Sequence, residues 1–367
     1  MQYAAVFGAT LIISWFLTGL MRSVAFKYKI VSIPRVRDIH KKLIPRLGGV
    51  AIFISFFLVS LIVFILNKSL TFGPGIWLGL DKHFCGILLG GLIIIVSMLI
   101  DDVYGLRAWQ KFFFQLLAVI VLIASGIGID TLRNPFGDAI NLNSVYIPII
   151  TVRGVVYHFS LWSDLLTLIW MVGMMNVINF VDGVDGLASG LSLIAAGTIF
   201  MLALQGAINQ PALAYVAIIL AGASAGFLIW NFPPAKIFMG DTGSMFLGYM
   251  LGLLPLISGG KLATAFLVLG FPIVDGLIVA SNRVLKSQNP FTTPDKTHLH
   301  HRFIRAGFSQ RQSIIFLYLI AIAFAWVALR STTVGKLIAA GVLILLLIIL
   351  IFYLKYRTGR IKSKELA

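Results

Sequence analysis

Short clusters of polar residues interrupt an otherwise apolar chain, and they contain groups that bind phosphate or a divalent cation. The acidic and amide groups among them are Asp101, Asp102, Asn179, Asp182, Asp185 and Asp241. Hard cations such as Mg²⁺ take oxygen ligands, typically one or two protein carboxylates together with substrate phosphates and water. This residue set therefore predicts phosphoryl transfer supported by a divalent cation.

A basic cluster complements the acidic ones. Three of the six histidines, His298, His300 and His301, fall within four residues of the segment THLHHRF, which also contains Arg302. Basic groups neutralise phosphate charge, and the glycines in the acidic segments let the backbone approach a phosphate closely. The chain has no Walker A motif, no Rossmann fingerprint and no HExxH zinc motif.

Each cluster also has a simpler interpretation. An acidic pair at a helix end is often only solvated, DGVDG is typical of a tight turn, and GDTGS is typical of a helix N-cap. However, Asn179, Asp182 and Asp185 recur every three residues, so one helical turn would align them on one side. The joint occurrence of all the clusters favours one composite site.

Apolar helices must position these clusters. Of the 367 residues, 59% are hydrophobic and 11% are charged, against about 25% charged in ordinary globular domains. A membrane-spanning helix needs about 20 mostly apolar residues. Eleven such stretches lie at 3–21, 48–67, 84–100, 112–129, 164–181, 187–205, 211–230, 243–260, 262–282, 312–330 and 337–354. The sequence predicts an all-α polytopic membrane protein that forms a single domain over residues 1–367.

The basic residues predict its orientation. With the N-terminus outside and the C-terminus in the cytoplasm, the inner segments hold 22 of the 29 Lys and Arg residues. These segments are 22–47, 101–111, 231–242, 283–311 and 355–367. Such a bias orients membrane proteins, so the net charge of +16 does not indicate a nucleic-acid partner. The same topology brings every polar cluster to the cytoplasmic face. A single cysteine, Cys85, excludes an internal disulfide.

The order and spacing of these motifs resemble those of the polyprenyl-phosphate N-acetylhexosamine-1-phosphate transferases, glycosyltransferase family 4. The resemblance covers most of the chain, from RxxHxxxxPRLGG through DD, NxxNFxDGxDGLA and FMGDTGS to PFxxxDxxHLHHRF. One position departs from the pattern: Gly105 stands where relatives commonly carry a charged residue.

The resemblance implies a reaction in the bacterial cytoplasmic membrane. Undecaprenyl phosphate would attack the β-phosphorus of a UDP-N-acetyl sugar and release UMP. The HLHH segment looks like the branch that uses UDP-GlcNAc, which starts teichoic acid, O-antigen or related glycans. The branch that uses UDP-MurNAc-pentapeptide remains an alternative, and a homodimer is a further expectation from the resemblance.

The resemblance also implies roles for particular residues. Asp241 and Asn179 match metal ligands, with Mg²⁺ as the expected ion and Mn²⁺ as an alternative. Asp182 and Asp185 match groups that shape the metal and nucleotide site, and Asp101 or Asp102 matches a base or an orienting group for the lipid phosphate. Lys111 matches a phosphate-binding lysine. The residues that match contacts to the diphosphate and nucleotide are His298, His300, His301 and Arg302, with Arg37, His40 and Arg46 as weaker candidates.

One charged residue lies inside an apolar stretch. Asp275 is separated from Arg283 by eight residues, about 12 Å along a helix. Charged residues within a span are functional candidates, although a neutral Asp bonded to a neighbouring helix is an equal alternative. Together with Pro272, Asp275 also supports a secondary transporter as an alternative function. Against a transporter, nearly all the acidic residues fall at one face and no inverted repeat is visible.

Overall fold

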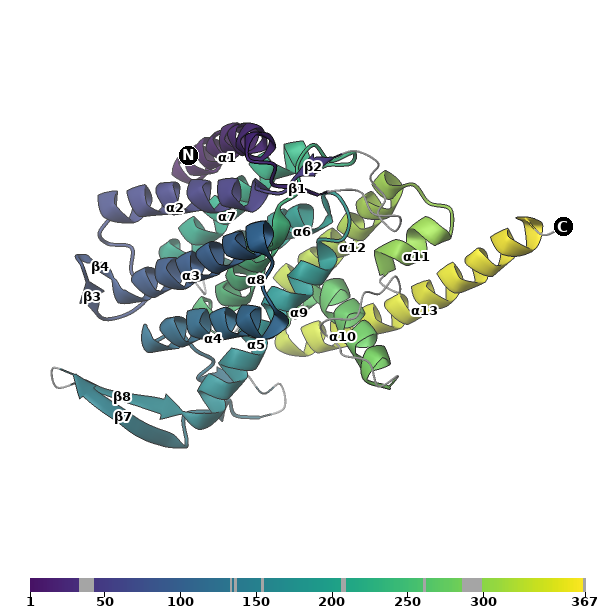
Figure 1. Ribbon diagram of the computed structural model, residues 1–367. Coiled ribbons are helices and arrows are strands. Elements are labelled where there is room, and N and C mark those ends of the chain that lie inside the picture. The colour runs from purple at the N-terminus through teal and green to yellow at the C-terminus, as the bar shows by residue number, and fades with distance from the viewer. Residues whose placement is uncertain are drawn as a thin grey trace.

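The protein is described by a computed structural model that covers residues 1–32, 43–132, 134, 137–152, 155–205, 209–259, 262–285 and 299–365. Helices dominate it, and they run roughly alongside one another in one bundle (Figure 1). The helices are α1 (Gln2–Lys27), α2 (Gly48–Leu66), α3 (Lys82–Tyr104), α4 (Ala108–Ala124), α5 (Leu161–Val181), α6 (Leu187–Ala203), α7 (Pro211–Asn231), α8 (Gly240–Ile257), α9 (Leu262–Val268), α10 (Gly270–Leu285), α11 (Leu299–Arg305), α12 (Gln310–Arg330) and α13 (Thr333–Glu365).

Within the described residues, four small antiparallel hairpins connect the helices. Their strands are β1 (Val31–Ser32) with β2 (Ile44–Pro45), β3 (Ile76–Trp77) with β4 (Leu80–Asp81), β5 (Thr131–Leu132) with β6 (Ile140–Asn141), and β7 (Tyr146–Val152) with β8 (Val155–Ser160). The sequence did not predict them. In Figure 1 the β3–β4 and β7–β8 hairpins lie at one end of the bundle, and α11 lies at the other.

The all-α, multi-pass character predicted from the composition is confirmed. Within the described residues, seven helices are long and apolar enough to cross a membrane, or eight when the bent pair α9–α10 is taken as one span. All eleven predicted stretches fall on helices, but α4 and α6 have only 17 residues each. The count of eleven spans and their orientation stay predictions.

Two stretches differ from their predicted form. The fourth, predicted to run to residue 129, ends as a helix at Ala124. The ninth is broken: α9 and α10 meet at an angle of 79°. Pro272 lies in the first turn of α10 and has no N–H to donate to the preceding turn. A straight helix across this junction is therefore disfavoured.

Helix α8 lies at the centre of the packing. It contacts α2, α3, α5, α6, α7 and α9, and nearly all of its side chains are buried. Its small residues allow the neighbouring helices to approach closely, as in other membrane bundles. The N-terminal end of α8 carries the FMGDTGS motif, and the PRLGG, DD and NxxNFxDGxDGLA motifs lie on or beside helices that touch this one.

An especially close approach joins α2 to α8. The backbone N–H groups of Gly48 and Gly49 donate to the carbonyls of Phe238 (3.0 Å) and Met239 (2.9 Å). A Cβ atom on Gly49 would lie 2.1 Å from the backbone nitrogen of Gly243. The PRLGG and FMGDTGS segments therefore meet backbone to backbone, and only glycine fits at this contact.

We expect Gly49→Ala to destabilise the protein by about 1–3 kcal/mol or more, because overpacking against rigid backbone forces the two helices apart. Thermal unfolding in detergent measures the effect. Gly197→Ala is the matched control, since a Cβ there meets nothing within 4 Å and alanine favours a helix. Equal melting temperatures for the two variants would contradict the packing.

Candidate functional site

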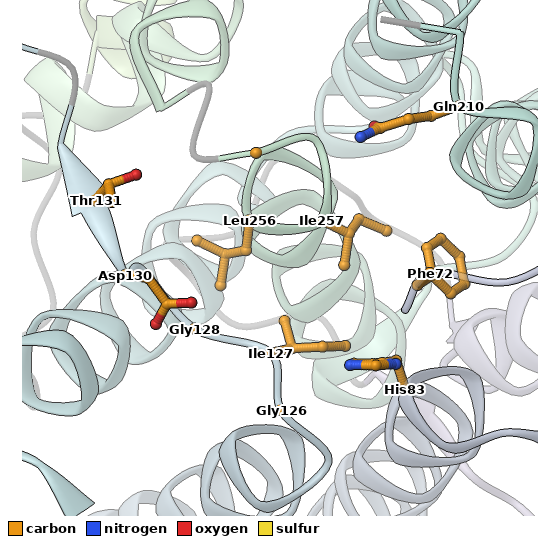
Figure 2. Close-up of a pocket in the computed structure, with 11 residues that line it drawn as sticks. Phe72, His83, Gly126, Ile127, Gly128, Asp130, Thr131, Gln210, Leu256 and Ile257 are labelled. Atoms are coloured by element: carbon orange, nitrogen blue, oxygen red, sulfur yellow. The ribbon is translucent and has the colours of Figure 1, made fainter. Parts of the chain in front are cut away.

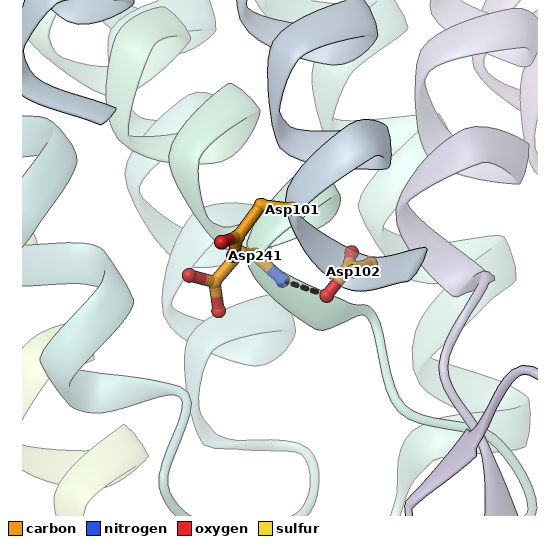
Figure 3. A group of neighbouring side chains, drawn as sticks. All are labelled: Asp101, Asp102 and Asp241. Atoms are coloured by element: carbon orange, nitrogen blue, oxygen red, sulfur yellow. Dashed lines mark hydrogen bonds between the residues drawn. The ribbon is translucent and has the colours of Figure 1, made fainter. Parts of the chain in front are cut away.

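Three carboxylates meet where the end of α3 reaches the start of α8. Asp101 and Asp102 lie near the C-terminal end of α3, and Asp241 lies in the first turn of α8 (Figure 3). One oxygen from each lies within 4.8 Å of the others. Residues separated by about 140 positions in the sequence thus form one acidic cluster.

Asp102 holds the start of α8. Its Oδ1 accepts a hydrogen bond from the Asp241 N–H (3.0 Å), and its Oδ2 accepts from the Thr242 N–H (3.0 Å) and the Thr242 hydroxyl (2.6 Å). The first N–H groups of a helix have no partner within the helix. The expected N-cap of GDTGS is therefore supplied by α3, not by its own Asp or Thr. Gly240, at φ 72°, makes room, because a Cβ there would lie 2.3 Å from Asp102 Oδ2.

Asp101 points to a different partner. Its Oδ1 accepts from the Leu106 N–H (2.7 Å), and its Oδ2 lies 2.6 Å from Lys111 Nζ. The same Nζ lies 2.7 Å from Asp241 Oδ2. Lys111, near the start of α4, thus joins two of the three carboxylates. Asp101 and Asp102 therefore contact different parts of the protein, although they are adjacent in the chain.

Arg46 supplies the second cation. It follows β2, which is fixed because Pro45 O accepts from the Phe238 N–H (2.8 Å). Its Nη2 lies 3.5 Å from Asp102 Oδ1 and 3.9 Å from Asp241 Oδ1, and the side chain is 38% exposed. The structure thus brings this weaker candidate into the cluster. His40 and Arg37 lie outside the described residues.

The end of α5 forms another wall. Asn179 Nδ2 donates to Ser244 Oγ of α8 (2.9 Å). The prediction that one helical turn aligns Asn179, Asp182 and Asp185 is wrong, because α5 ends at Val181. Asp185 instead accepts from the Ala235 N–H (2.9 Å) in the loop before α8. The following Gly186 has φ 77°, a left-handed conformation that suits glycine, and it directly precedes α6.

Asn231 is a residue that the motif analysis missed. Its Oδ1 accepts from the Gly186 N–H (2.9 Å) and from Ser189 Oγ (3.2 Å), and its Nδ2 donates to Ile237 O (3.0 Å). It therefore ties the DGVDG turn to the loop that precedes FMGDTGS. The sequence feature that could have identified Asn231 is its position as an amide at the end of an apolar helix.

The donor set fits a hard divalent cation. Within the part of the chain that is described, the three residues of the cluster offer carboxylate oxygens, with no cysteine or histidine among them. Among the described residues, the carboxyl groups of Asp101, Asp102, Asp182 and Asp241 outnumber the cations Lys111 and Arg46. A divalent cation would balance this difference.

Burial is the main influence on the pKa of Asp182, and the surrounding negative charge adds to it. Burial raises the pKa of Asp182 well above its usual range, and the negative charge of Asp241 raises it further. Desolvation and like charge both disfavour the carboxylate. This carboxyl group therefore retains a proton more readily than an ordinary aspartic acid unless a cation approaches it.

The histidine-rich segment lies in and before α11. His298 and the side chain of His300 lie outside the described residues. His301 and Arg302 are part of α11, which packs against α12 and α13. Asp275 of α10 accepts a hydrogen bond from the Leu299 N–H (2.9 Å) at the start of α11.

A cavity of about 320 Å³ lies at the other ends of α3 and α8 (Figure 2). Its lining includes His83 near the start of α3 and Leu256 near the end of α8. His83 Nδ1 lies 3.3 Å from Asp81 Oδ1. About 19 residues of α3 separate His83 from the acidic cluster, or about 28 Å of helix. This cavity is therefore distinct from the candidate site.

Known proteins share this sequence pattern. Residues 84–259 match the model of the family described as "Glycosyl transferase family 4". A protein of Bacillus subtilis named "Probable undecaprenyl-phosphate N-acetylglucosaminyl 1-phosphate transferase" is 34% identical over 95% of this chain and 90% of its own length. The "Decaprenyl-phosphate N-acetylglucosaminephosphotransferase" of Mycolicibacterium smegmatis is 35% identical, over 84% of this chain and 77% of its own. The "Undecaprenyl-phosphate alpha-N-acetylglucosaminyl 1-phosphate transferase" of Yersinia pestis is 27% identical, over 83% and 78%.

Proposed function

The chain belongs to glycosyl transferase family 4, and we propose that it transfers N-acetylglucosamine 1-phosphate from UDP-GlcNAc to undecaprenyl phosphate. An oxygen of the lipid phosphate attacks the β-phosphorus of the donor. The bond between that phosphorus and the oxygen bridging to the α-phosphate breaks, and UMP leaves. The products are UMP and a lipid-linked sugar diphosphate, so atoms and charge balance without a further reactant.

The observation that carries this proposal is the convergence of Asp101, Asp102, Asp241, Lys111 and Arg46 at one end of the bundle. Phosphoryl transfer requires mainly positioning and charge neutralisation. The positive charges of Lys111 and Arg46 would reduce the repulsion between the two anionic substrates that must come together. The relatives named above act on polyprenyl phosphates, which matches this requirement and gives the transporter alternative no support.

The residues of the cluster have different roles in this proposal. Lys111 Nζ, which lies between Asp101 and Asp241, attracts the phosphate of the lipid in this proposal. Arg46, which is more exposed than Lys111, binds the diphosphate of the soluble donor in this proposal, and His301 and Arg302 provide further contacts to the donor. An ionised phosphate needs no general base, so Asp101 serves by orienting Lys111.

A divalent cation, for which Mg²⁺ is the proposed ion, would offset the charge of the diphosphate and of the departing UMP when bound. Asp241 and Asn179 are its proposed protein ligands, and Asp182 and Asp185 shape the surrounding site. Asp102 acts through the backbone of α8, where it keeps Asp241 in place.

We propose that this end of the bundle faces the cytoplasm of a bacterial cell, as the excess of Lys and Arg in the corresponding segments predicts. The soluble nucleotide sugar would then reach the site from the cytoplasm, while the lipid tail stays in the bilayer. The product would serve the synthesis of cell-envelope glycans such as teichoic acid or O-antigen.

The decisive experiment measures UMP release by the purified protein with undecaprenyl phosphate and Mg²⁺. The donors are UDP-GlcNAc, other UDP-N-acetyl sugars and UDP-MurNAc-pentapeptide. We expect UMP with UDP-GlcNAc, loss of activity with EDTA and recovery with excess Mg²⁺. Release only with the muramyl donor would change the substrate, and no release from a folded sample with any donor would refute the function.

The raised pKa of Asp182 predicts a pH-dependent affinity for the metal. Because a cation favours the carboxylate form, binding should expel the proton that Asp182 holds at lower pH. Affinity should therefore rise with pH and level off once the pH exceeds the raised pKa. Calorimetric titration with Mg²⁺ in two buffers of different ionisation enthalpy measures the released proton. Wild-type protein without proton release, or Asp182→Asn with the same release, would contradict this assignment.

A further inference from the structure

Asp275 is a buried carboxyl group inside an apolar helix, and one of its contacts is with the start of another helix. The residue is 7% exposed in α10, and its Oδ1 accepts a 2.9 Å hydrogen bond from the backbone N–H of Leu299. Leu299 is the first residue of α11 and is 1% exposed. The first N–H groups of a helix lack partners within the helix. Asp275 therefore provides, from another helix, the acceptor that an N-cap side chain normally provides.

The position of Asp275 relates α11 to the candidate site. A Cβ atom on the adjacent Gly276 would lie 3.5 Å from Val177 Cγ2 of α5. Val177 is two residues before Asn179 and five before Asp182, in the last part of α5. The contact that holds the start of α11 thus lies level with the end of α5 that borders the acidic cluster.

We propose that Asp275 is a positioning residue, which fixes α11 so that His301 and Arg302 are oriented toward the nucleoside diphosphate of the donor. The inference rests on the proposed function, because it assigns the basic groups of α11 to that substrate. Neither group touches the lipid phosphate in this assignment. Preorganisation of groups that bind the substrate accounts for a large part of enzymatic rate, and small displacements reduce it steeply.

The first test is a kinetic comparison of Asp275→Ala with wild type. We expect kcat/KM for UDP-GlcNAc to fall about 10- to 100-fold, mainly through a higher KM for the donor. The KM for undecaprenyl phosphate should stay within about twofold of wild type, since Lys111 is unaffected. Asp275→Asn keeps an oxygen that accepts from the Leu299 N–H, so it should restore most of the donor affinity. Equal changes in both KM values, or none, would overturn the proposal.

Asp164→Ala is the matched control. Asp164 is 6% exposed, and its Oδ2 accepts from the Ser160 N–H (2.8 Å) at the opposite end of α5. The substitution thus removes the same kind of buried contact away from the site. We expect it to lower the melting temperature without changing the KM for UDP-GlcNAc. If Asp164→Ala raised the KM for UDP-GlcNAc as much as Asp275→Ala does, Asp275 would contribute only to the general stability of the protein.

Hydrogen exchange gives a readout that does not depend on activity. The backbone amides of residues 299–305 should exchange faster in Asp275→Ala than in wild type or in Asp164→Ala. If UMP release fails for the wild type, the proposed function falls while this exchange result still reports the anchoring. If Asp275→Ala does not fold, Leu299→Pro is the alternative variant. It removes the backbone N–H that donates to Asp275, and proline is well tolerated at the first position of a helix. A folded Leu299→Pro variant with wild-type donor KM would then refute the proposal.

Discussion

Asp241→Asn is expected to lower kcat by about 10²- to 10³-fold, the loss typical when one preorganised electrostatic group is removed from an active site. Asp241 is the carboxylate that contacts both cations, with Oδ2 at 2.7 Å from Lys111 and Oδ1 at 3.9 Å from Arg46. The amide has no net charge to hold a divalent cation. The concentration of Mg²⁺ that gives half-maximal activity should therefore rise as kcat falls.

UMP release at several Mg²⁺ concentrations measures both effects. Asp138→Asn is the control, because it makes the same change at an exposed carboxylate and should leave kcat and the Mg²⁺ requirement unchanged. The backbone N–H of Asp241 still donates to Asp102 in the variant, so the melting temperature should stay close to that of wild type. Full activity of Asp241→Asn would refute the proposed metal site.

The second large effect is a contrast between neighbours. Asp102→Asn is expected to reduce both activity and stability, whereas Asp101→Asn should reduce activity alone. The Asp102 side chain is fully buried and accepts three hydrogen bonds from the start of α8. An amide can accept through only one of its two positions, so at least one buried donor loses its partner. Such a loss costs about 1–3 kcal/mol, and it displaces the backbone that carries Asp241.

Asp101→Asn leaves the fold contact intact. The amide oxygen can still accept from the Leu106 N–H, and only the ion pair with Lys111 is lost. We expect activity to fall by about 10- to 100-fold, as for the loss of a residue that orients another functional group, with an unchanged melting temperature. Thermal unfolding and UMP release on the same preparations separate the two variants. If Asp101→Asn were the less stable variant, the assignment of the two roles would be reversed.

Much of the architecture was predictable because it depends on properties of local sequence. The apolar stretches forecast the helices, since burial of backbone in lipid requires every N–H and C=O to bond within the segment. The motif order also indicated the family. The broken ninth stretch and the hairpins were not predicted, because a bend at α9–α10 and a pairing such as Tyr146 with Ser160 depend on contacts with other segments.

The sequence by itself determined which residue types were available to the site: scarce carboxylates, clustered histidines, and glycines at the turns. Only the tertiary structure decided their roles. Asp101 and Asp102 are adjacent in the chain, yet successive residues point about 100° apart around a helix. One therefore meets Lys111 of α4 and the other meets the backbone of α8. Arg46 likewise joined the cluster because Gly49 lets α2 touch α8. Partners of this kind are set by which helices pack together, and no local pattern contains that information.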